Sequence, residues 1–232
     1  MTTTGAGRPR LSTRKRPGAT ARDEILDAAA ELFTTRGFTG TSTRTIADAV
    51  GIRQASMYHH FATKDDILAA LLIGTVSAPA ACADLLRERC DDPFVRIYAL
   101  ILFDAGQLAR SHWNLGALYL MPEVRTERFA SFRTQRGDLM QRYADFARDA
   151  LAAVGASDVS SGVLELPFRL AESMISARSD ATATSSVPAL TPTAIADAAL
   201  RILGWTSPTA EIADRANALL AELQESCPQP GT

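Results

Sequence analysis

Apolar side chains recur at helical spacing along most of this 232-residue chain. In the first such stretch, Ile25, Ala29, Leu32 and Phe33 fall on one face when about 3.6 residues make a turn. No run of alternating β-branched residues is long enough to form a sheet. The pattern therefore predicts an all-α fold, with helices at about residues 20–35, 42–50, 53–60, 64–78, 93–110, 113–120, 123–154, 159–178, 192–204 and 208–226.

Prolines and small polar residues separate these predicted helices. Proline favours the first turn of a helix and disrupts its interior, so we place helix boundaries at Pro79, Pro93, Pro122, Pro192 and Pro208. Pro167 lies within an otherwise periodic stretch, which predicts either a late helix start near Leu166 or a kink. Residues 179–191 are rich in small polar side chains and are predicted to form a mobile surface loop.

The second and third predicted helices are short and are joined by Gly51. A hydroxyl of Thr41 or Ser42 can cap the start of the first of them, and Ile46 and Val50 supply its apolar face. Gly51 can take the left-handed conformation that ends a helix and reverses the chain. The helix that follows divides into an apolar side and a polar side, as a helix that reads the DNA major groove requires.

These residues resemble the DNA-binding domain of the TetR family of bacterial one-component regulators, over roughly residues 20–72. The run that carries the resemblance is Thr41, Ser42, Ile46, Ala47, Gly51, Ile52, Ser56, Met57, Tyr58, His60, Phe61 and Lys64. The resemblance implies a three-helix DNA-binding domain at residues 20–63, which contains the helix-turn-helix. It also implies a larger helical domain at residues 64–227 that binds an effector and dimerises.

Roles for residues of the DNA-binding domain also follow from the resemblance. Phosphate contacts are expected from Thr41, Ser42, Tyr58, His60 and Lys64, whereas contacts to base edges are expected from Arg44, Arg53, Gln54 and Ser56. Two alternatives remain open for side chains in this segment. Thr41 and Ser42 can serve purely as helix caps, and His59 can point to solvent.

Charge divides the chain in the same place. Residues up to Lys64 hold ten basic and five acidic side chains, whereas the remainder holds 14 basic and 21 acidic ones. Residues 1–19 are predicted to form a disordered basic arm that contacts DNA through Arg14, Lys15 and Arg16. The alternative is a tail that only aids solubility.

Aromatic and methionine side chains of the larger domain form either its core or the walls of an effector pocket. The resemblance implies a cavity between these helices, and rings with a polar tip suit a mostly apolar pocket. We therefore expect a small, largely apolar effector, in contact with Tyr98, Phe103, Trp113, Tyr119, Met121, Phe129, Phe168 and Met174. Four arginines could instead serve an acidic effector or form a solvated face, namely Arg125, Arg128, Arg133 and Arg136.

A single reader helix contacts too few base pairs to specify a site, which predicts a homodimer on a pseudo-palindromic double-stranded DNA operator. By resemblance, a four-helix bundle would form this dimer through Leu166, Leu170, Met174, Ile195, Ala199 and Ile202. The alternative is that these apolar faces pack within their own domain. The predicted function is a repressor that a small molecule releases from DNA; a ligand-independent architectural protein and an activator are the alternatives.

Other classes of function find little support in the sequence. No catalytic constellation, phosphate-binding loop or metal-ligand spacing appears, so neither an enzyme nor a cofactor is expected. Cys82, Cys90 and Cys227 are expected to be free thiols, with a redox pair as the alternative. No apolar stretch reaches the roughly 20 residues that cross a bilayer, so we expect a cytoplasmic protein, associated with the nucleoid when it is bound to DNA.

Overall fold

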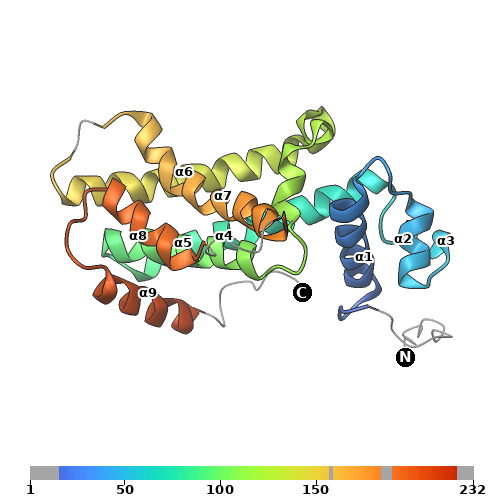
Figure 1. The fold of residues 1–232 in the computed structure, drawn as a ribbon, viewed down its shortest axis with the longest axis horizontal. Helices are drawn as coiled ribbons and strands as arrows, with labels where there is room; N and C mark the ends of the chain where they lie inside the picture. Colours follow the sequence, from blue (N-terminus) through green and yellow to red (C-terminus); the bar gives the residue numbers. More distant parts are fainter. Residues whose placement is uncertain (1–15, 157–158, 184–189, 224–232) are drawn as a thin grey trace, which may run out of the picture. The chain divides into compact units, whose positions relative to one another are not determined.

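A computed structural model describes residues 16–156, 159–183 and 190–223 (Figure 1). Within these ranges all regular structure is helical, which confirms the predicted all-α fold. The elements, in order, are α1 (Ala21–Arg36), α2 (Thr43–Val50), α3 (Gln54–Tyr58), α4 (Lys64–Arg89), α5 (Pro93–Arg110), η1 (Leu115–Leu120), η2 (Pro122–Arg125), η3 (Glu127–Phe129), α6 (Ala130–Ala153), α7 (Ser161–Ala183), α8 (Pro192–Ile202) and α9 (Ala210–Leu223).

The chain divides into two compact units between Ile67 and Leu68, inside α4. The sequence places this boundary a few residues earlier, at 63/64. In the smaller unit α1 packs against α2, and α2 packs against α3. Ile25, Phe33 and Met57 are buried in its core, where the ring of Phe33 meets that of Phe38 at 5.1 Å between centroids.

Caps and one glycine fix the turns of the smaller unit. Ser42 begins α2, and its hydroxyl accepts a hydrogen bond from the backbone N–H of Thr45 at 3.0 Å. Gly51 ends α2 in the left-handed region, with φ 78° and ψ 32°, and its N–H reaches the carbonyls of Ala47 and Asp48. This tight reversal brings α3 back beside α2.

The larger unit is built around α5, which packs against α6, α7, α8 and α9 (Figure 1). Asp92 caps the start of α5 by accepting from the backbone N–H groups of Phe94 and Val95. A hydrogen bond of 2.7 Å from the Gln107 side chain to the carbonyl of Thr75 joins α5 to α4. Most of α5 is therefore enclosed by other helices.

Two predicted boundaries in the larger unit are wrong. Pro79 does not end a helix, because α4 continues through it to Arg89, and Cys82, Ala83 and Leu86 on the inner face of the following turns are fully buried. Their burial offsets the backbone hydrogen bond that proline cannot make. Of the two alternatives for Pro167, the late start is excluded, because α7 begins at Ser161 and contains this proline. The predicted end at residue 178 is wrong, since α7 extends to Ala183 into the predicted loop; residues 184–189 of that loop lie outside the described residues.

Residues 115–129 also differ from expectation. Three short 3-10 helices stand where the sequence predicts α-helices at 113–120 and at the start of 123–154. Pro122 lacks the N–H that a continuous helix would use, so the chain ends η1 at Leu120 and starts η2 afresh.

Among the described residues, α4 alone has the length and composition of a membrane-crossing helix. Its most apolar window is 56% buried inside the chain. Core helices share this character, so length and hydropathy do not by themselves indicate a membrane span.

Candidate functional sites

The exposed face of α2 and α3 carries a small hydrogen-bonded group of polar side chains. The Gln54 amide donates to the hydroxyl of Thr43 at 3.0 Å and to that of Tyr58 at 3.3 Å, and the two hydroxyls lie 3.3 Å apart. Tyr58 is 47% exposed although it is aromatic. The group fixes the positions of Gln54 and Tyr58 across two helices through Thr43, which is not among the residues predicted to contact DNA.

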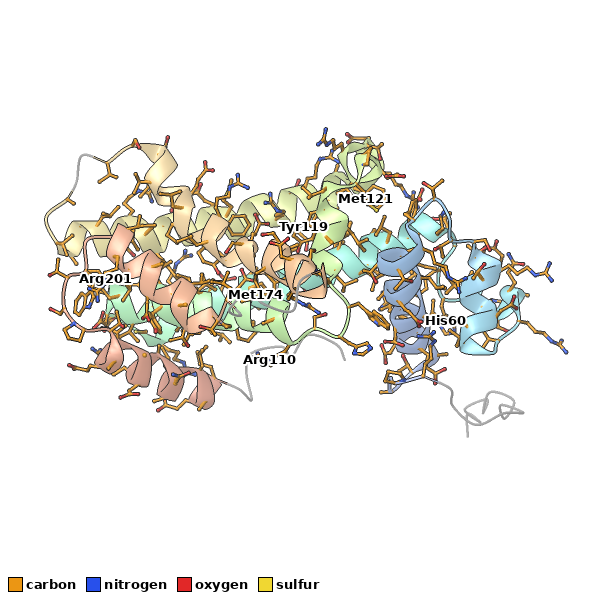
Figure 2. All side chains as sticks on the ribbon, in the orientation of Figure 1. His60, Arg110, Tyr119, Met121, Met174 and Arg201 are labelled. Atoms are coloured by element: carbon orange, nitrogen blue, oxygen red, sulfur yellow. The ribbon has the colours of Figure 1, made fainter. Side chains whose placement is uncertain are left out.

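Most of the predicted DNA-contacting residues are solvent-exposed on this unit. Arg44 has 81% of its side chain exposed, and only a long ion pair of 4.0 Å links it to Asp48. Arg53 stands at the start of α3 without a capping bond from its side chain. The other exposed members are Ser42, Gln54, Ser56, Tyr58 and His60, of which His60 is labelled in Figure 2.

Thr41 and Lys64 are placed differently from the prediction. The Thr41 hydroxyl is buried and donates to the backbone carbonyls of Leu32 and Gly37, so it has no surface to offer a phosphate. The Lys64 ammonium is half-buried: it donates to the carbonyls of Phe38 and Thr41 at 2.7 and 2.9 Å and lies 4.0 Å from the centre of the Phe38 ring. Both side chains therefore connect α4 and the start of α2 to the turn after α1.

Arg16 is the only residue of the predicted arm triplet that lies within the described residues; Arg14 and Lys15 lie outside them. Its guanidinium forms ion pairs with Asp27, at 2.8 Å, and with Glu31, both on α1. It also donates to the carbonyl of Ala49 at 3.3 Å. Because two carboxylates already neutralise it, Arg16 does not fit the predicted role of a free DNA-contacting side chain.

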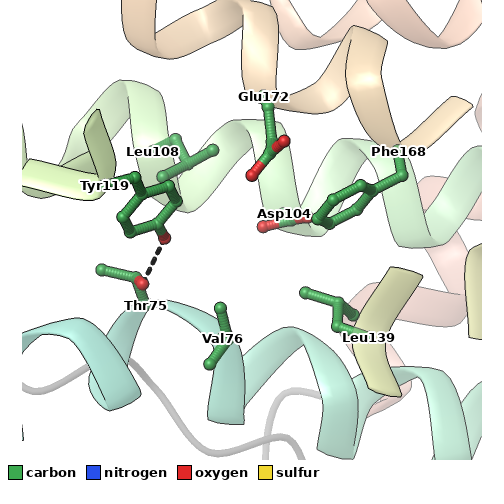
Figure 3. A pocket seen from close by; sticks show the side chains of 8 residues that line it. All are labelled: Thr75, Val76, Asp104, Leu108, Tyr119, Leu139, Phe168 and Glu172. Carbon is green, nitrogen blue, oxygen red and sulfur yellow. Dashed lines mark hydrogen bonds between the residues drawn. The ribbon is translucent and has the colours of Figure 1, made fainter. Parts of the chain in front are cut away.

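The core of the larger unit holds a small polar void of about 10 Å³ (Figure 3). Its walls come from α4, α5, η1, α6 and α7, and its lining residues are Thr75, Val76, Asp104, Leu108, Tyr119, Leu139, Phe168 and Glu172. A void of this size holds about one water molecule. Figure 3 shows the carboxylates of Asp104 and Glu172 directed towards each other across it, with the Tyr119 hydroxyl against that of Thr75.

Asp104 is the most unusual group at this void. It is 3% exposed, and it accepts hydrogen bonds of 3.0 Å from the Gln107 amide and from the Tyr143 hydroxyl. Burial raises the pKa of its carboxyl group to about 6, despite the opposing effect of these two donors. No ion pair to Asp104 is found in the part of the chain that the structure describes.

Glu172, by contrast, is neutralised. The guanidinium of Arg136 pairs with both of its carboxylate oxygens, with the Nε to Oε1 distance at 2.8 Å, and Arg169 approaches at 3.5 Å. Arg136 also lies over the Phe168 ring, 5.0 Å from its centre. Of the two alternatives that the sequence leaves open for Arg136, an acidic effector or a solvated face, the structure matches neither directly: this arginine is half-buried and pairs with Glu172.

Of the residues predicted to form the pocket, only Tyr119 and Phe168 line this void. Tyr98, Phe129 and Met174 are buried elsewhere in the core, and Figure 2 labels Met174. The remaining three, Phe103, Trp113 and Met121, are partly exposed and do not line it. The predicted set consists of aromatic and methionine side chains, whereas the distinctive feature of the void is the carboxylate of Asp104.

A signal for Asp104 was present in the sequence. Leu100 and Leu108 stand four residues before and after it, so a carboxylate occupies an otherwise apolar helical stripe. All three residues are buried in the structure.

The predicted dimer residues separate into two groups. Met174, Ile195 and Ala199 are buried within their own unit, as the alternative interpretation holds, and they present no surface to a partner. Leu166 and Ile202 are 38% and 40% exposed, and Leu170 is half-buried.

The cysteines offer little chemistry. Cys82 is buried and Cys90 half-buried, neither forms a disulfide bond within the described residues, and Cys227 lies outside them. No cluster of three or more metal-ligating side chains occurs within the described ranges.

Comparison with known proteins agrees with this arrangement. A family model described as bacterial regulatory proteins of the tetR family matches residues 25–71. The HTH-type transcriptional repressor KstR2 of Mycobacterium tuberculosis is 47% identical over 91 residues, which are 39% of this chain and 46% of that protein. The matched stretch thus spans about half the length of this curated relative.

Solved structures extend the comparison to the larger unit. AmtR of Mycobacterium smegmatis is 51% identical to this chain, with a TM-score of 0.81 over 90% of this chain and 98% of that one. The ketosteroid transcriptional regulator KstR2 of Mycobacterium tuberculosis has a TM-score of 0.61 at 22% identity and shares the fold. Similarity to a solved regulator therefore covers both units.

Proposed function

This chain belongs to the TetR family of bacterial regulatory proteins, and from that premise we propose that it is a homodimeric transcriptional repressor which a small molecule releases from its operator. The observation that carries the DNA-binding part is the exposed polar face of α2 and α3, where Gln54 and Tyr58 are held by Thr43. The same face leaves Arg44 free to extend into solvent. A helix in the major groove requires such a set of donors and acceptors.

Within this proposal the exposed residues have two roles. Arg44, Arg53, Gln54 and Ser56 read base edges, with arginine suited to guanine and glutamine to adenine. Ser42, Tyr58 and His60 contact phosphates and fix the register. Lys64 supports the turn by donating two of its three ammonium N–H groups to the carbonyls of Phe38 and Thr41. In this proposal the third N–H contacts a phosphate.

Selection of bound fragments from random double-stranded DNA tests the proposal. The full chain is expected to enrich a pseudo-palindromic site, and Arg44→Ala is expected to relax the preference at one position in each half-site. Arg148→Ala is a matched control, because Arg148 is also an exposed arginine paired with an aspartate on its own helix. If no sequence were enriched at moderate salt, the repressor proposal would fail in favour of a non-specific architectural protein.

Dimerisation in this proposal uses the apolar side chains that remain at the surface of α7 and α8. Leu166 and Ile202 are exposed, whereas the buried members of the predicted set serve the core. Leu166→Glu is expected to shift sedimentation towards the monomer and to weaken operator binding. Leu120→Glu provides the control, because Leu120 is 79% exposed and belongs to neither helix.

Release by an effector requires that binding in the larger unit favour a dimer whose reading helices are wrongly spaced. The helix α4 belongs to both units, since it begins at Lys64 and ends at Arg89. We place the protein in the cytoplasm, where its operator lies, and we assign it neither a catalytic role nor a membrane. An activator would bind the same DNA, and a reporter gene behind the selected site distinguishes the two signs of regulation.

A further inference from the structure

We propose that the effector of this regulator carries a positively charged hydrogen-bond donor, such as an amine, amidine or guanidine, that binds Asp104 in the core of the larger unit. This inference rests on the proposed function, because it names the chemistry of the ligand that acts there. It replaces the largely apolar effector that the sequence predicts.

Asp104 carries a buried charge that no cation compensates within the described residues. Its two hydrogen-bond donors, Gln107 and Tyr143, are neutral, and within the described ranges no ion pair reaches it. An isolated carboxylate in a core is unfavourable unless a cation accompanies it. Glu172, 68 positions further along the chain, shows the alternative, because Arg136 pairs with both of its oxygens.

The other walls of the void also suit a cationic hydrogen-bond donor. The hydroxyls of Tyr119 and Thr75 can accept hydrogen bonds from a ligand, and the ring of Phe168 lies beside the void (Figure 3). Aromatic faces attract cations, as Arg136 over Phe168 at 5.0 Å already illustrates. An anionic ligand would instead meet the unneutralised carboxylate of Asp104, and an apolar one would leave Asp104 without a counter-charge.

The void must enlarge before it can admit a ligand. The void of about 10 Å³ is too small for an organic amine, so one wall must move when the ligand enters. Tyr119 belongs to η1, and 3-10 helices have poorer hydrogen-bond geometry than α-helices. The side chain of Asn114 holds this segment to α7 through the Ile175 carbonyl at 2.9 Å. Displacement of Tyr119 from Thr75 would open the void beside Asp104.

A matched series of probes tests the ligand class on the full-length wild-type chain. Putrescine and agmatine carry cationic ends, 1,4-butanediol is a neutral analogue of similar length, and succinate is an anionic one. Thermal shift and calorimetry at pH 7.5 are expected to show binding of at least one cation and of neither analogue. If the diol or succinate bound as tightly as the best cation, or if no cation bound, the inference would be wrong.

Two variants then locate the site. Asp104→Asn is expected to weaken cation binding by roughly tenfold or more, because a charge-assisted hydrogen bond is lost. Asp197→Asn is the matched control, since Asp197 also accepts a hydrogen bond from a tyrosine hydroxyl, that of Tyr98 at 2.9 Å, but does not line the void. Equal loss in both variants, or unchanged binding in Asp104→Asn, would overturn the assignment. Circular dichroism checks that both variants fold, and the probe series decides independently if one does not.

The DNA readout separates this inference from the proposed function. Fluorescence anisotropy with the selected operator is expected to show that the bound cation lowers DNA affinity. If the operator is bound and a different class of compound releases it, the cationic effector is refuted while the repressor proposal stands. If no operator is selected, the repressor proposal fails on its own evidence.

Discussion

Replacing Asp104 by asparagine removes a buried negative charge while it retains a side chain of nearly the same shape. The asparagine oxygen can accept the bond from the Gln107 amide, and its NH₂ can donate to the Tyr143 hydroxyl. The Tyr143 hydroxyl in turn lies 3.4 Å from the Leu100 carbonyl, to which it can donate. We therefore expect Asp104→Asn to fold normally and to be more stable than the wild-type protein at neutral pH.

The magnitude follows from the pKa of the Asp104 carboxyl group. Burial raises this pKa from 3.8 to about 6. Between these two pH values the folded state therefore keeps the proton, whereas the unfolded state has released it. The stabilisation from this proton is complete below pH 3.8 and is lost as the pH rises through about 6. A shift of about two pKa units corresponds to roughly 3 kcal/mol of unfolding free energy above pH 6.

The groups that face Asp104 do not reverse this sign. Gln107 and Tyr143 are its neutral donors, and Glu172 across the void adds a like charge that raises the pKa further. Arg136 is committed to Glu172. Burial of the Asp104 side chain in the core of the larger unit is thus the dominant cause of its raised pKa.

Urea unfolding followed by circular dichroism, at pH 4 and at pH 7.5, measures the effect. At pH 7.5 Asp104→Asn is expected to exceed the wild type by up to about 3 kcal/mol, and near pH 4 the difference should largely vanish. Asp197→Asn serves again as the control and should show no gain at pH 7.5. Carboxylates whose pKa is lowered, such as Asp84 beside Arg142, are present in every protein compared, so their contributions cancel.

Two results would refute this reasoning. A variant less stable than the wild type at pH 7.5 would mean that ionised Asp104 stabilises the fold through a compensating charge. A gain of the same size at both pH values would mean that packing, and not ionisation, distinguishes the two side chains.

Three other substitutions probe the remaining sites. Lys64→Met should lower the free energy of unfolding by about 1–3 kcal/mol in urea titrations, because two backbone carbonyls lose their charged donor; an unchanged midpoint would argue against this supporting role. Gly116→Ala should destabilise the larger unit by about 1–3 kcal/mol in thermal melts, since an added Cβ would lie 2.4 Å from side-chain atoms of Ile175. Gln54→Ala should reduce base discrimination by about 1–3 kcal/mol at one position of the selected site, measured by anisotropy with single-base variants, whereas a uniform loss across all positions would indicate a contact with phosphate.

The smaller unit could be predicted closely because its chain reversals have local causes. Gly51 adopts the left-handed conformation that the sequence predicts, and Ser42 caps the helix that it was expected to begin. Two side chains there were misassigned for a tertiary reason. Arg16 and Thr41 have polar groups suited to phosphate, but both are bound within the unit. Arg16 forms an ion pair with Glu31, and the Thr41 hydroxyl donates to the Leu32 carbonyl.

The larger unit was harder to predict because helical spacing identifies an apolar face of a helix but not whether that face is buried within the unit or exposed to a partner. Met174 and Ile195 occur at the spacing expected for a dimer face, yet they are buried within the unit. Pro79 has the local character of a helix boundary and is overruled by the burial of the helix around it. The polar void is lined by residues of five segments, α4, α5, η1, α6 and α7, and amino-acid composition does not predict which residues of different segments come into contact.

The proposed role of Asp104 in effector binding would connect stability to regulation in this protein. The free energy that Asp104→Asn would recover, up to about 3 kcal/mol, is also the most that a cationic ligand could gain by neutralising the same charge. A coupling of about 3 kcal/mol changes an equilibrium roughly 150-fold, which lies at the upper end of typical allosteric effects. A small gain in stability for Asp104→Asn therefore sets a low upper limit on the release of DNA that neutralising this charge can cause, and a large gain permits strong release if the cation binds the released state more tightly. The two measurements are made on different equilibria, so their agreement would tie the effector to the buried carboxylate.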